Sequence, residues 1–416
     1  MDQSEIQSLW TTVAPAAWPD APTEMTVTTL TEIEACPRRW ALGVAQYPAL
    51  WTGWGYPPRV NLGALAGTVV HYTLEDITKG LVRADCPSLQ HPTAYQVMKD
   101  LGGYTKVVHE CIDRVLANLA DNPRARALCE YTARSLRARV PELRTRAQTL
   151  LCRVQLPQLE GSHSISHKSK HLGPLNSGVY SELQLHARSI GWKGKADLLT
   201  LSPEVCGITD FKTGKPHDRH RFQIQVYALL WSRDIEINPN GQRADRLVLA
   251  YSNGDVEVPA PTAIELDALE NQIVARRDAV HQAVSRHPPE ASPSFNNCQY
   301  CGVRQLCNKY WTTDIQRRMA EDDRDKHFAD IEVRIIGQHG PLSWDAIVNY
   351  SSVAEPGQPV LLRANLLPFT PKLDQRIRFL SVHLSLSDEQ PHASEAERPT
   401  IVATVGANSE AYLVSE

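Results

Sequence analysis

Three consecutive strand-like runs in the middle of the chain constrain its fold most strongly. They have the alternating or apolar patterns typical of β-strands and cover residues 179–190, 192–202 and 205–214. The second run contains Asp197, and the third contains Asp210 and Lys212. Residues i and i+2 of a strand project from the same face, so Asp210 and Lys212 point the same way, and strand pairing can bring Asp197 beside them. The pattern therefore predicts two carboxylates and a lysine on one face of a sheet.

Such a set of side chains suits a divalent cation, because carboxylate oxygens are the ligands that Mg²⁺ and Mn²⁺ prefer. A bound ion can polarise a phosphate oxygen and lower the pKa of its water, and a neighbouring lysine can stabilise the charge that develops at phosphorus. An Asp-x-Lys pair is also common on protein surfaces. Here, however, Asp210 follows apolar residues that predict a buried strand, where charges are costly without a purpose. We therefore expect phosphodiester hydrolysis at this site.

The motifs around these residues resemble the RecB-type branch of the PD-(D/E)XK nuclease superfamily. The match runs from GWKGKAD through DFKTG to a Gln-x-x-x-Tyr pattern on the next predicted helix. The resemblance implies that Asp197 and Asp210 hold the metal and that Lys212 takes part in catalysis. It also implies that Gln223 and Tyr227, which share one helix face at a spacing of four, contact the substrate.

Two upstream positions extend this resemblance. GTVVHYTLED lies on a helix expected to begin near Leu62 and is similar to the family's first motif, whose histidine completes the metal shell. This implies that His71 is a metal ligand. Glu182, at the head of the first strand, matches an acidic position before the Asp motif. It is a candidate metal ligand or a residue that contacts the ligands without binding the metal itself. Without the neighbouring motifs, a single histidine on a helix would indicate a structural residue.

Three closely spaced cysteines follow the nuclease-like motifs. Cys298, Cys301 and Cys307 form a C-x2-C-x5-C pattern, which is a metal-ligand set short of one member in a chain that shows no export signal. Zinc is one candidate, although its structural sites usually offer two local pairs or nearby histidines. The missing ligand could be Cys36, in a Cys-Pro-Arg-Arg-Trp segment. Buried structural thiols are the remaining alternative.

An early cysteine combined with a late C-x2-C-x5-C pattern is similar to the iron–sulfur subset of RecB-type nucleases, which includes AddB and CRISPR-associated exonucleases. The resemblance implies a [4Fe–4S] cluster held by Cys36, Cys298, Cys301 and Cys307. The other cysteines are spread over apolar faces and are predicted to be small core residues: Cys86, Cys111, Cys129, Cys152 and Cys206. No disulfide framework is expected from cysteines with this uneven spacing.

The order of predicted elements divides the chain into three parts. Residues 1–24 form an N-terminal arm. Residues 25–320 form the nuclease domain, an α/β fold with a central mixed sheet flanked by helices and a helical insert at about 94–160. Five short strand-like runs then predict a small β-barrel, OB-like, over 325–416.

Charge is unevenly distributed along the chain, whose net charge is −4. Residues 121–171 contain ten Lys or Arg and four Asp or Glu, so this segment could line a path for nucleic acid, although an ordinary solvated helix face has the same pattern. Residues 321–416 contain fifteen acidic and eight basic residues. For the predicted barrel, contact with a protein is therefore a better expectation than binding to phosphates.

Composition and motifs together predict the class of function. With 42% hydrophobic and 22% charged residues, no signal segment and no run of 18 apolar residues, we expect a cytoplasmic protein without a membrane partner. The resemblance implies a Mg²⁺- or Mn²⁺-dependent deoxyribonuclease, an exonuclease acting on single-stranded DNA or DNA ends in repair or antiviral defence. One alternative is the nuclease subunit of a helicase-containing complex, since the chain lacks the G-x-x-x-x-G-K-[ST] motif of a motor. Another is a non-catalytic DNA-binding scaffold.

Overall fold

The computed structural model describes residues 9–154, 156, 173–313, 328–351, 354–365, 367–386, 401–406 and 409–415. The chain divides into two units, one built from Pro22–Thr31 and Arg59–His281 and the other from Met1–Ala21, Glu32–Pro58 and Gln282–Glu416. We call the first the sheet unit and the second the barrel unit, after the β-structure in each. None of the described helices is both long and apolar enough to cross a membrane.

The sheet unit is built on a five-stranded mixed sheet with the order β2-β3-β4-β5-β6. The strands are β2 (Gly178–Ala187), β3 (Trp192–Leu201), β4 (Cys206–Lys212), β5 (Arg246–Tyr251) and β6 (Gly254–Val258). Only β4 and β5 run parallel, and the other neighbours are antiparallel. The sequence pattern does not predict β6, because this edge strand is short and half of its side chains face solvent.

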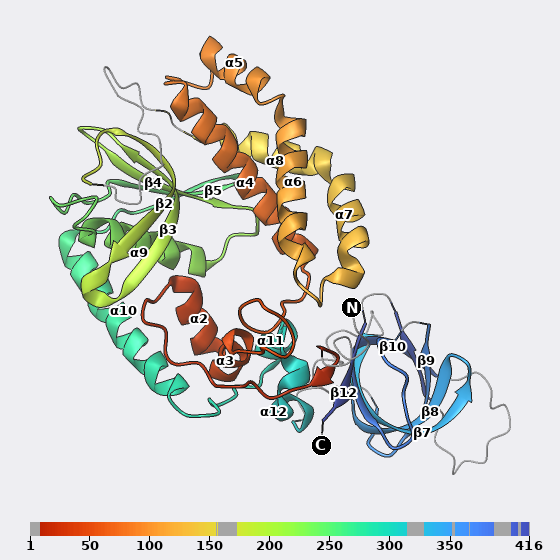
Figure 1. Cartoon of the computed structure of the whole chain (residues 1–416). Helices are drawn as coiled ribbons and strands as arrows, with labels where there is room; N and C mark the ends of the chain where they lie inside the picture. Colours follow the sequence, from red (N-terminus) through yellow and green to blue (C-terminus); the bar gives the residue numbers. More distant parts are fainter. Residues whose placement is uncertain are drawn as a thin grey trace. The chain divides into compact units, whose positions relative to one another are not determined.

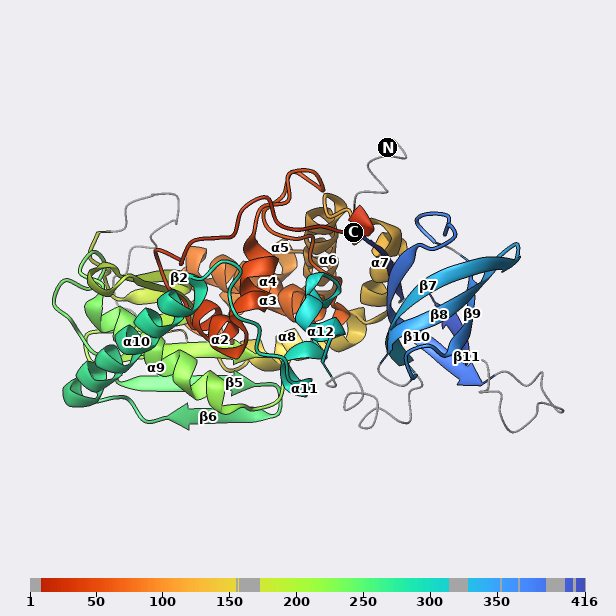
Figure 2. The ribbon, with the colours of Figure 1, turned by 90° about the horizontal axis from the view of Figure 1, so that it is seen from below.

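Three long helices surround the sheet, as Figures 1 and 2 show. Helix α9 (Asp218–Arg233) packs on β2 to β5, α4 (Leu62–Arg83) packs against β2, and α10 (Ala263–Val284) follows β6. Helix α4 begins at the predicted residue because the side chain of Asn61 accepts hydrogen bonds from the N–H groups of Gly63 and Ala64, at 3.0 and 3.1 Å. Such an N-cap satisfies two donors that the first turn cannot satisfy itself.

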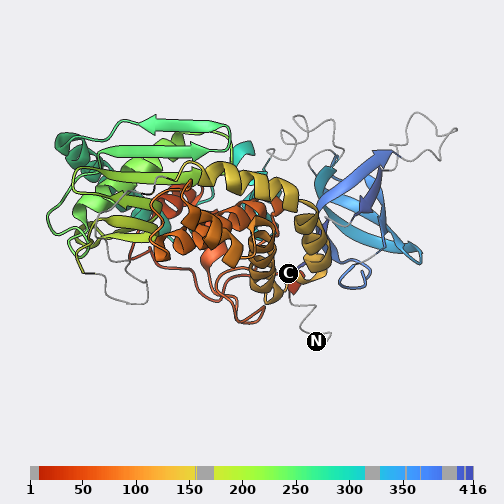
Figure 3. The same ribbon diagram turned by 90° about the horizontal axis from the view of Figure 1, so that it is seen from above.

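The helices that lie between α4 and β2 in the sequence form a bundle with α4 (Figure 3). They are α5 (Pro92–Asp100), α6 (Tyr104–Ala120), the 3₁₀ turn η1 (Arg126–Leu128), α7 (Cys129–Ala138) and α8 (Val140–Leu151). Their apolar faces share one buried core with residues from four strands of the sheet, namely Val179, Leu198, Phe211 and Ala250. The bundle thereby fixes α4 against the sheet.

Eight basic residues of 121–171 are described, on α7, α8 and the segments around them, and four of them form the following ion pairs. The pairs are Arg137–Asp113 at 2.9 Å, Arg139–Glu142 at 2.9 Å, Arg146–Glu142 at 2.7 Å and Arg153–Asp255 at 3.3 Å. Pairs of this kind are typical of a solvated helix face. Residues 157–171 of this segment lie outside the described part of the chain.

The barrel unit contains a closed five-stranded barrel, which confirms the predicted small C-terminal barrel. Its strands are β7 (Phe328–Gly340), β8 (Ser343–Ser351), β9 (Pro359–Ala364), β10 (Arg376–Leu386) and β11 (Ile401–Val405). They follow the order β7-β8-β9-β11-β10, and pairing of β10 with β7 closes the barrel. The β9–β11 pair is parallel. Alternate residues of these strands form the barrel core, with Ile331, Val333, Leu362, Ile377 and Phe379 fully or almost fully buried.

Two further strands extend the sheet from β10. Strand β12 (Glu410–Val414) pairs antiparallel with β10, and β1 (Thr11–Thr12) pairs parallel with β12. The sequence pattern predicts neither of them. Residues from the beginning of the chain are therefore part of the β-structure at its other end.

The segment around Cys36 forms two helices. Helix α2 (Val27–Ala35) ends before Cys36, and α3 (Pro37–Val44) begins directly after it. Cys36 has an extended backbone, with φ −165° and ψ 103°. A residue before proline is disfavoured in the helical region, so Pro37 causes the break. Three short helical elements carry the late cysteines: α11 (Phe295–Cys298), η3 (Arg304–Leu306) and α12 (Asn308–Trp311).

Candidate active site and cysteine site

Three candidate metal ligands meet in the sheet unit. His71 of α4, Glu182 of β2 and Asp197 of β3 each offer one ligand atom, and these atoms lie within 4.8 Å of one another. They line a groove that encloses about 720 Å³, including its open mouth. The other lining residues are mostly small: Gly63, Ala64, Gly67, Thr68, Tyr72 and Thr213. An imidazole and two carboxylates are a ligand set that a divalent cation accepts.

The backbone at Glu182 is strained. Its φ is 55°, in the left-handed region that side chains other than glycine rarely adopt. Strands β2 and β3 pair through Ser181–Leu198 and Leu183–Ala196. Glu182 and Asp197, which lie opposite each other between these two pairs, are not paired. Strained residues of this kind persist only when the surrounding structure holds them, and they cluster at functional sites.

A lysine that the sequence motifs do not single out also contacts this group. Lys195 forms an ion pair with Glu182. Burial opposes the charge of Lys195, but the bond to Glu182 and the negative charges of Glu182, Glu75 and Asp197 together outweigh it and raise the pKa of this lysine. Lys195 precedes Asp197 by two residues on β3, and this spacing on one strand was the signal available in the sequence.

Asp210 and Lys212 of β4 lie beside the three ligands. Lys212 Nζ is 2.5 Å from Asp210 Oδ2, and the backbone N–H of Phe211 donates to Asp197 Oδ2 at 2.6 Å. Asp210 is only 2% exposed, and its Oδ2 accepts no well-aligned hydrogen bond from the described residues. A carboxylate has about four lone-pair sites, so Asp210 can pair with Lys212 and still offer a ligand atom to a cation. The structure therefore brings together all four predicted metal ligands and Lys212, although Asp210 lies outside the converging set of three.

Burial and like charges make this site unfavourable for ionised acids. Burial raises the pKa of Asp197 and of Asp210 well above their usual range; repulsion from Glu182 adds to the effect on Asp197, and repulsion from Asp197 adds to that on Asp210. Burial also lowers the pKa of His71, which favours the neutral imidazole that binds metals. A divalent cation would offset the repulsion among these carboxylates.

We expect the metal-free protein to lose stability as the pH rises. The pKa of Asp197 and of Asp210 is raised from 3.8 to about 7 on folding, so the stability that these groups contribute is present below pH 4 and is lost as the pH passes through 7. The loss is on the order of 2–4 kcal/mol. Urea denaturation in EDTA between pH 5 and pH 8 measures it, and subtracting the curve of the Asp197→Asn/Asp210→Asn variant removes the contribution of other groups. Parallel curves for the two proteins would contradict this prediction.

Gln223 and Tyr227 of α9 form a chain of hydrogen bonds that ends at Lys212. Lys212 Nζ donates to Gln223 Oε1 at 2.8 Å, and Gln223 Nε2 donates to Tyr227 OH at 2.6 Å. Tyr227 is buried, and burial is the main reason that its pKa is raised. Both side chains are thus placed where they can fix the position of the lysine. Their predicted contact with substrate stays a prediction.

His220 and Tyr251 are further polar residues near the site that the motifs do not include. His220 Nδ1 lies 2.9 Å from Tyr251 OH, and Tyr251 is the register partner of Lys212 on β5. Burial, followed by the positive charges of Lys212 and Arg219, lowers the pKa of His220 to about 4. His220 lies one helical turn before Gln223, so periodicity could have placed it on the same face of α9.

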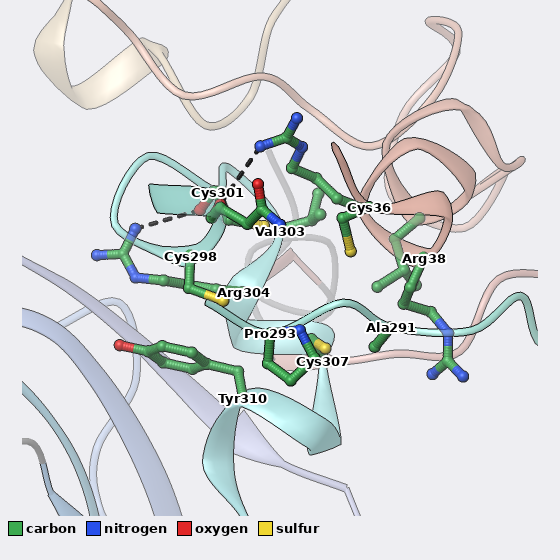
Figure 4. A pocket seen from close by; sticks show the side chains of 13 residues that line it. Cys36, Arg38, Ala291, Pro293, Cys298, Cys301, Val303, Arg304, Cys307 and Tyr310 are labelled. Carbon is green, nitrogen blue, oxygen red and sulfur yellow. Dashed lines mark hydrogen bonds between the residues drawn. The ribbon is translucent and has the colours of Figure 1, made fainter. Parts of the chain in front are cut away.

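The four predicted cysteine ligands line one pocket in the barrel unit. Cys36 comes from the α2–α3 segment, and Cys298, Cys301 and Cys307 come from the late segment, as Figure 4 shows. The pocket encloses about 350 Å³, including space open to solvent, and all four thiols are free. Burial raises the pKa of Cys298, Cys307 and, to about 11, Cys301.

The two segments that carry these cysteines are also joined by hydrogen bonds. Asn297 Nδ2 donates to the carbonyl of Ala35 at 2.6 Å, Arg39 Nη1 donates to the carbonyl of Asn297 at 3.3 Å, and the N–H of Ser292 donates to Cys36 Sγ at 3.4 Å. Hydrogen bonds between the two segments therefore help to hold the four thiols around one pocket.

Buried ion pairs connect the late cysteine segment to the barrel. Arg304 Nε donates to Asp330 Oδ2 of β7 at 2.6 Å, and both side chains are 6% exposed. Arg378 of β10 donates to Glu332 Oε2 at 2.8 Å and to the carbonyl of Gln305 at 2.6 Å. Bonds of this strength between charged, buried groups fix the segment on the edge of the barrel.

Comparisons with known proteins agree with the geometry of the groove. The family model described as the PD-(D/E)XK nuclease superfamily matches residues 24–308. No curated protein matches the sequence. Fifteen chains of solved structures match it; for one, titled "Crystal structure of SSO0001", the identity is 20%, the match covers 31% of this chain and 59% of that chain, and the TM-score is 0.20. The family match confirms the predicted superfamily and, with it, the expectation of a metal-dependent nuclease. This chain belongs to the PD-(D/E)XK nuclease superfamily.

Proposed function

We propose that this protein is a metal-dependent deoxyribonuclease of the RecB type that acts on single-stranded DNA or on DNA ends. The observation that supports this most directly is the convergence of His71, Glu182 and Asp197 beside the Asp210–Lys212 ion pair. His71, Glu182 and Asp197 line an open groove rather than a closed core. A substrate phosphate can therefore approach them from solvent.

Each residue of the groove has a distinct proposed role. His71, Glu182, Asp197 and Asp210 would hold Mg²⁺ or Mn²⁺, which when bound lowers the pKa of water and polarises the phosphate. Lys212 would orient the attacking water or stabilise the charge that develops on the phosphate oxygens. Gln223 would keep Lys212 Nζ in place, because its Oε1 accepts a hydrogen bond from that nitrogen.

A cleavage assay on a panel of DNA substrates tests this function. With Mg²⁺ or Mn²⁺, end-labelled linear single strands should be degraded, and circular single strands of the same sequence should remain intact. Duplex and flap substrates show whether a free single-stranded end is required. Cleavage of the circles would contradict action from ends, and failure to cut any of these DNAs with either metal would contradict the nuclease assignment itself.

We also propose that Cys36, Cys298, Cys301 and Cys307 hold a [4Fe–4S] cluster. Four free thiols around one pocket, three of them buried and that of Cys307 half-buried, are a donor set that fits such a cluster, and the pocket lining includes no histidine or carboxylate. A cluster there would link residue 36 covalently to the late segment and so restrict the unfolded chain.

Replacing Cys36 by serine should remove most of the iron and sulfide from the protein, because serine cannot supply the fourth thiolate. Iron and sulfide analysis after anaerobic purification measures this, with about four iron atoms per chain expected for the unaltered protein. The exposed Cys152 provides a matched control, and Cys152→Ser should keep its iron. A Cys36→Ser protein with full iron would exclude Cys36 as a ligand, and zinc in place of iron would contradict the cluster.

We propose, finally, that the barrel is OB-like and binds a protein partner. A closed five-stranded barrel with the order β7-β8-β9-β11-β10 supports the first point. The excess of acidic residues in 321–416 supports the second, because it disfavours contact with phosphates.

A further inference from the structure

The β4–α9 turn and the first turn of α9 carry three exposed cations, Lys215 in the turn and Arg219 and Arg221 in the helix. Lys215, Arg219 and Arg221 are all exposed, and none of them has an ion-pair partner in the described part of the chain. The one acidic residue among them is Asp218. We call Lys215, Arg219 and Arg221 the turn cations. Exposed charges without counter-charges on the protein remain available to a ligand of opposite sign.

These cations continue directly from the groove. Thr213 lines the groove, and the turn cations begin two residues after it, at Lys215. The turn is held close to α4 at this point, since a Cβ atom at Gly67 would lie only 3.0 Å from Thr213 Oγ1. A chain of phosphates leaving the groove on this side would therefore pass the turn.

Electrostatics at the start of α9 add to the positive character of the turn. The side chain of His217 caps the helix by accepting from the N–H of Arg219, and α9 is sixteen residues long, so its N-terminal end carries a partial positive charge. The pKa of His220 is lowered mainly by burial and, to a smaller extent, by the positive charges of Lys212 and Arg219, so this residue also lies in a positive environment.

The other basic surface of the sheet unit has a different character. Arg137, Arg139 and Arg146 of α7 and α8 each form an ion pair with Asp113 or Glu142. Binding a phosphate at these three arginines would require breaking their ion pairs or placing the phosphate next to a carboxylate. The turn cations require neither.

We propose that the turn cations bind the phosphates of a single DNA strand next to the scissile bond, so that the strand path runs along the groove and over the β4–α9 turn rather than over α7 and α8. This inference rests on the proposed nuclease function and names the surface that recognises its substrate. A single strand fits the observations because the groove walls of α4 are small residues and the turn cations lie on one short segment next to it.

The salt dependence of binding tests this placement. Two triple variants are compared in a Lys212→Met background, which slows cleavage in Mg²⁺. One carries Lys215→Gln, Arg219→Gln and Arg221→Gln; the matched control carries Arg137→Gln, Arg139→Gln and Arg146→Gln. The affinity for a fluorescent 30-nucleotide single strand and for its duplex is measured between 50 and 300 mM salt. Circular dichroism and thermal unfolding of all proteins check that the folds are equal.

Each neutralised phosphate contact should change the slope of log K against log salt by about 0.7 for a single strand. The first variant should therefore show a slope shallower by about 2, with an affinity at least tenfold lower in 50 mM salt, and the control should match the parent. Equal slopes for parent and first variant, or an equal loss in the control, would overturn the proposed path. A loss confined to the duplex would overturn the choice of a single strand. If the Lys212→Met parent binds no DNA at all, the proposed function fails as well.

Discussion

Replacing Lys212 by methionine should lower the rate of DNA cleavage about 10²–10³-fold, the usual effect of removing one group that stabilises transition-state charge. Methionine fills a similar volume but cannot donate to Gln223 Oε1 or to a phosphate oxygen. Because His71, Glu182 and Asp197 are unchanged, metal binding should be kept. Single-turnover cleavage of a labelled strand measures the rate, and calorimetric titration with Mn²⁺ measures the metal affinity.

Lys193 provides the matched control for this variant. It lies on β3, and its Nζ is 3.0 Å from Glu24 Oε2, so it takes no part in the groove. Lys193→Met should cleave at the parent rate. A Lys212→Met protein within threefold of the parent rate would remove Lys212 from the active site, and a loss of Mn²⁺ binding would show that its effect comes from disturbing Asp210.

Replacing Arg304 by methionine should lower the free energy of unfolding by about 3–5 kcal/mol, because it leaves the carboxylate of Asp330 buried without its ion-pair partner. The pKa of Asp330 is lowered in the folded protein: burial opposes this, and Arg304, together with hydrogen bonds from Tyr310 and Ser381, more than compensates. Urea denaturation measures the change. Hydrogen exchange of the β7 and β10 amides shows whether the barrel strands lose stability.

Two further variants separate the cause from general damage to the core. Arg334→Met breaks the exposed Arg334–Asp374 pair of the same barrel and should cost about 0–1 kcal/mol. The Arg304→Met/Asp330→Leu double variant removes both buried charges and should recover much of the stability lost in the single variant. A double variant less stable than Arg304→Met would mean that packing, and not the unpaired charge, causes the loss.

Patterns with a strong local signal could be predicted from the sequence. The alternation in β3 and β4 places Asp197 and Asp210 on neighbouring strands, and the cap at Asn61 gives the start of α4. The superfamily follows from the motifs on these elements. The barrel strands β7 to β11 are likewise visible as short apolar runs, because each buries one face.

Features that depend on tertiary contacts could not be predicted in this way. The left-handed backbone of Glu182 is imposed by its surroundings, since glutamate has no local preference for it. The Gln-x-x-x-Tyr spacing shows that Gln223 and Tyr227 share a helix face, but the bond from Lys212 to Gln223 arises only when α9 packs on the sheet. Strand β1 is two residues long and exists only because β12 is available to pair with it.

The pairing of Thr11 with Leu413 has a consequence for the order of folding. The sheet unit lies almost wholly between residues 59 and 281, so its contacts are complete while later residues are still being synthesised. The barrel unit gathers segments separated by several hundred residues, and closing such long loops is slow. We therefore expect residues 9–21 and 32–58 to wait for the later segments of the barrel unit during biosynthesis, with the nuclease groove formed before the cysteine segments meet.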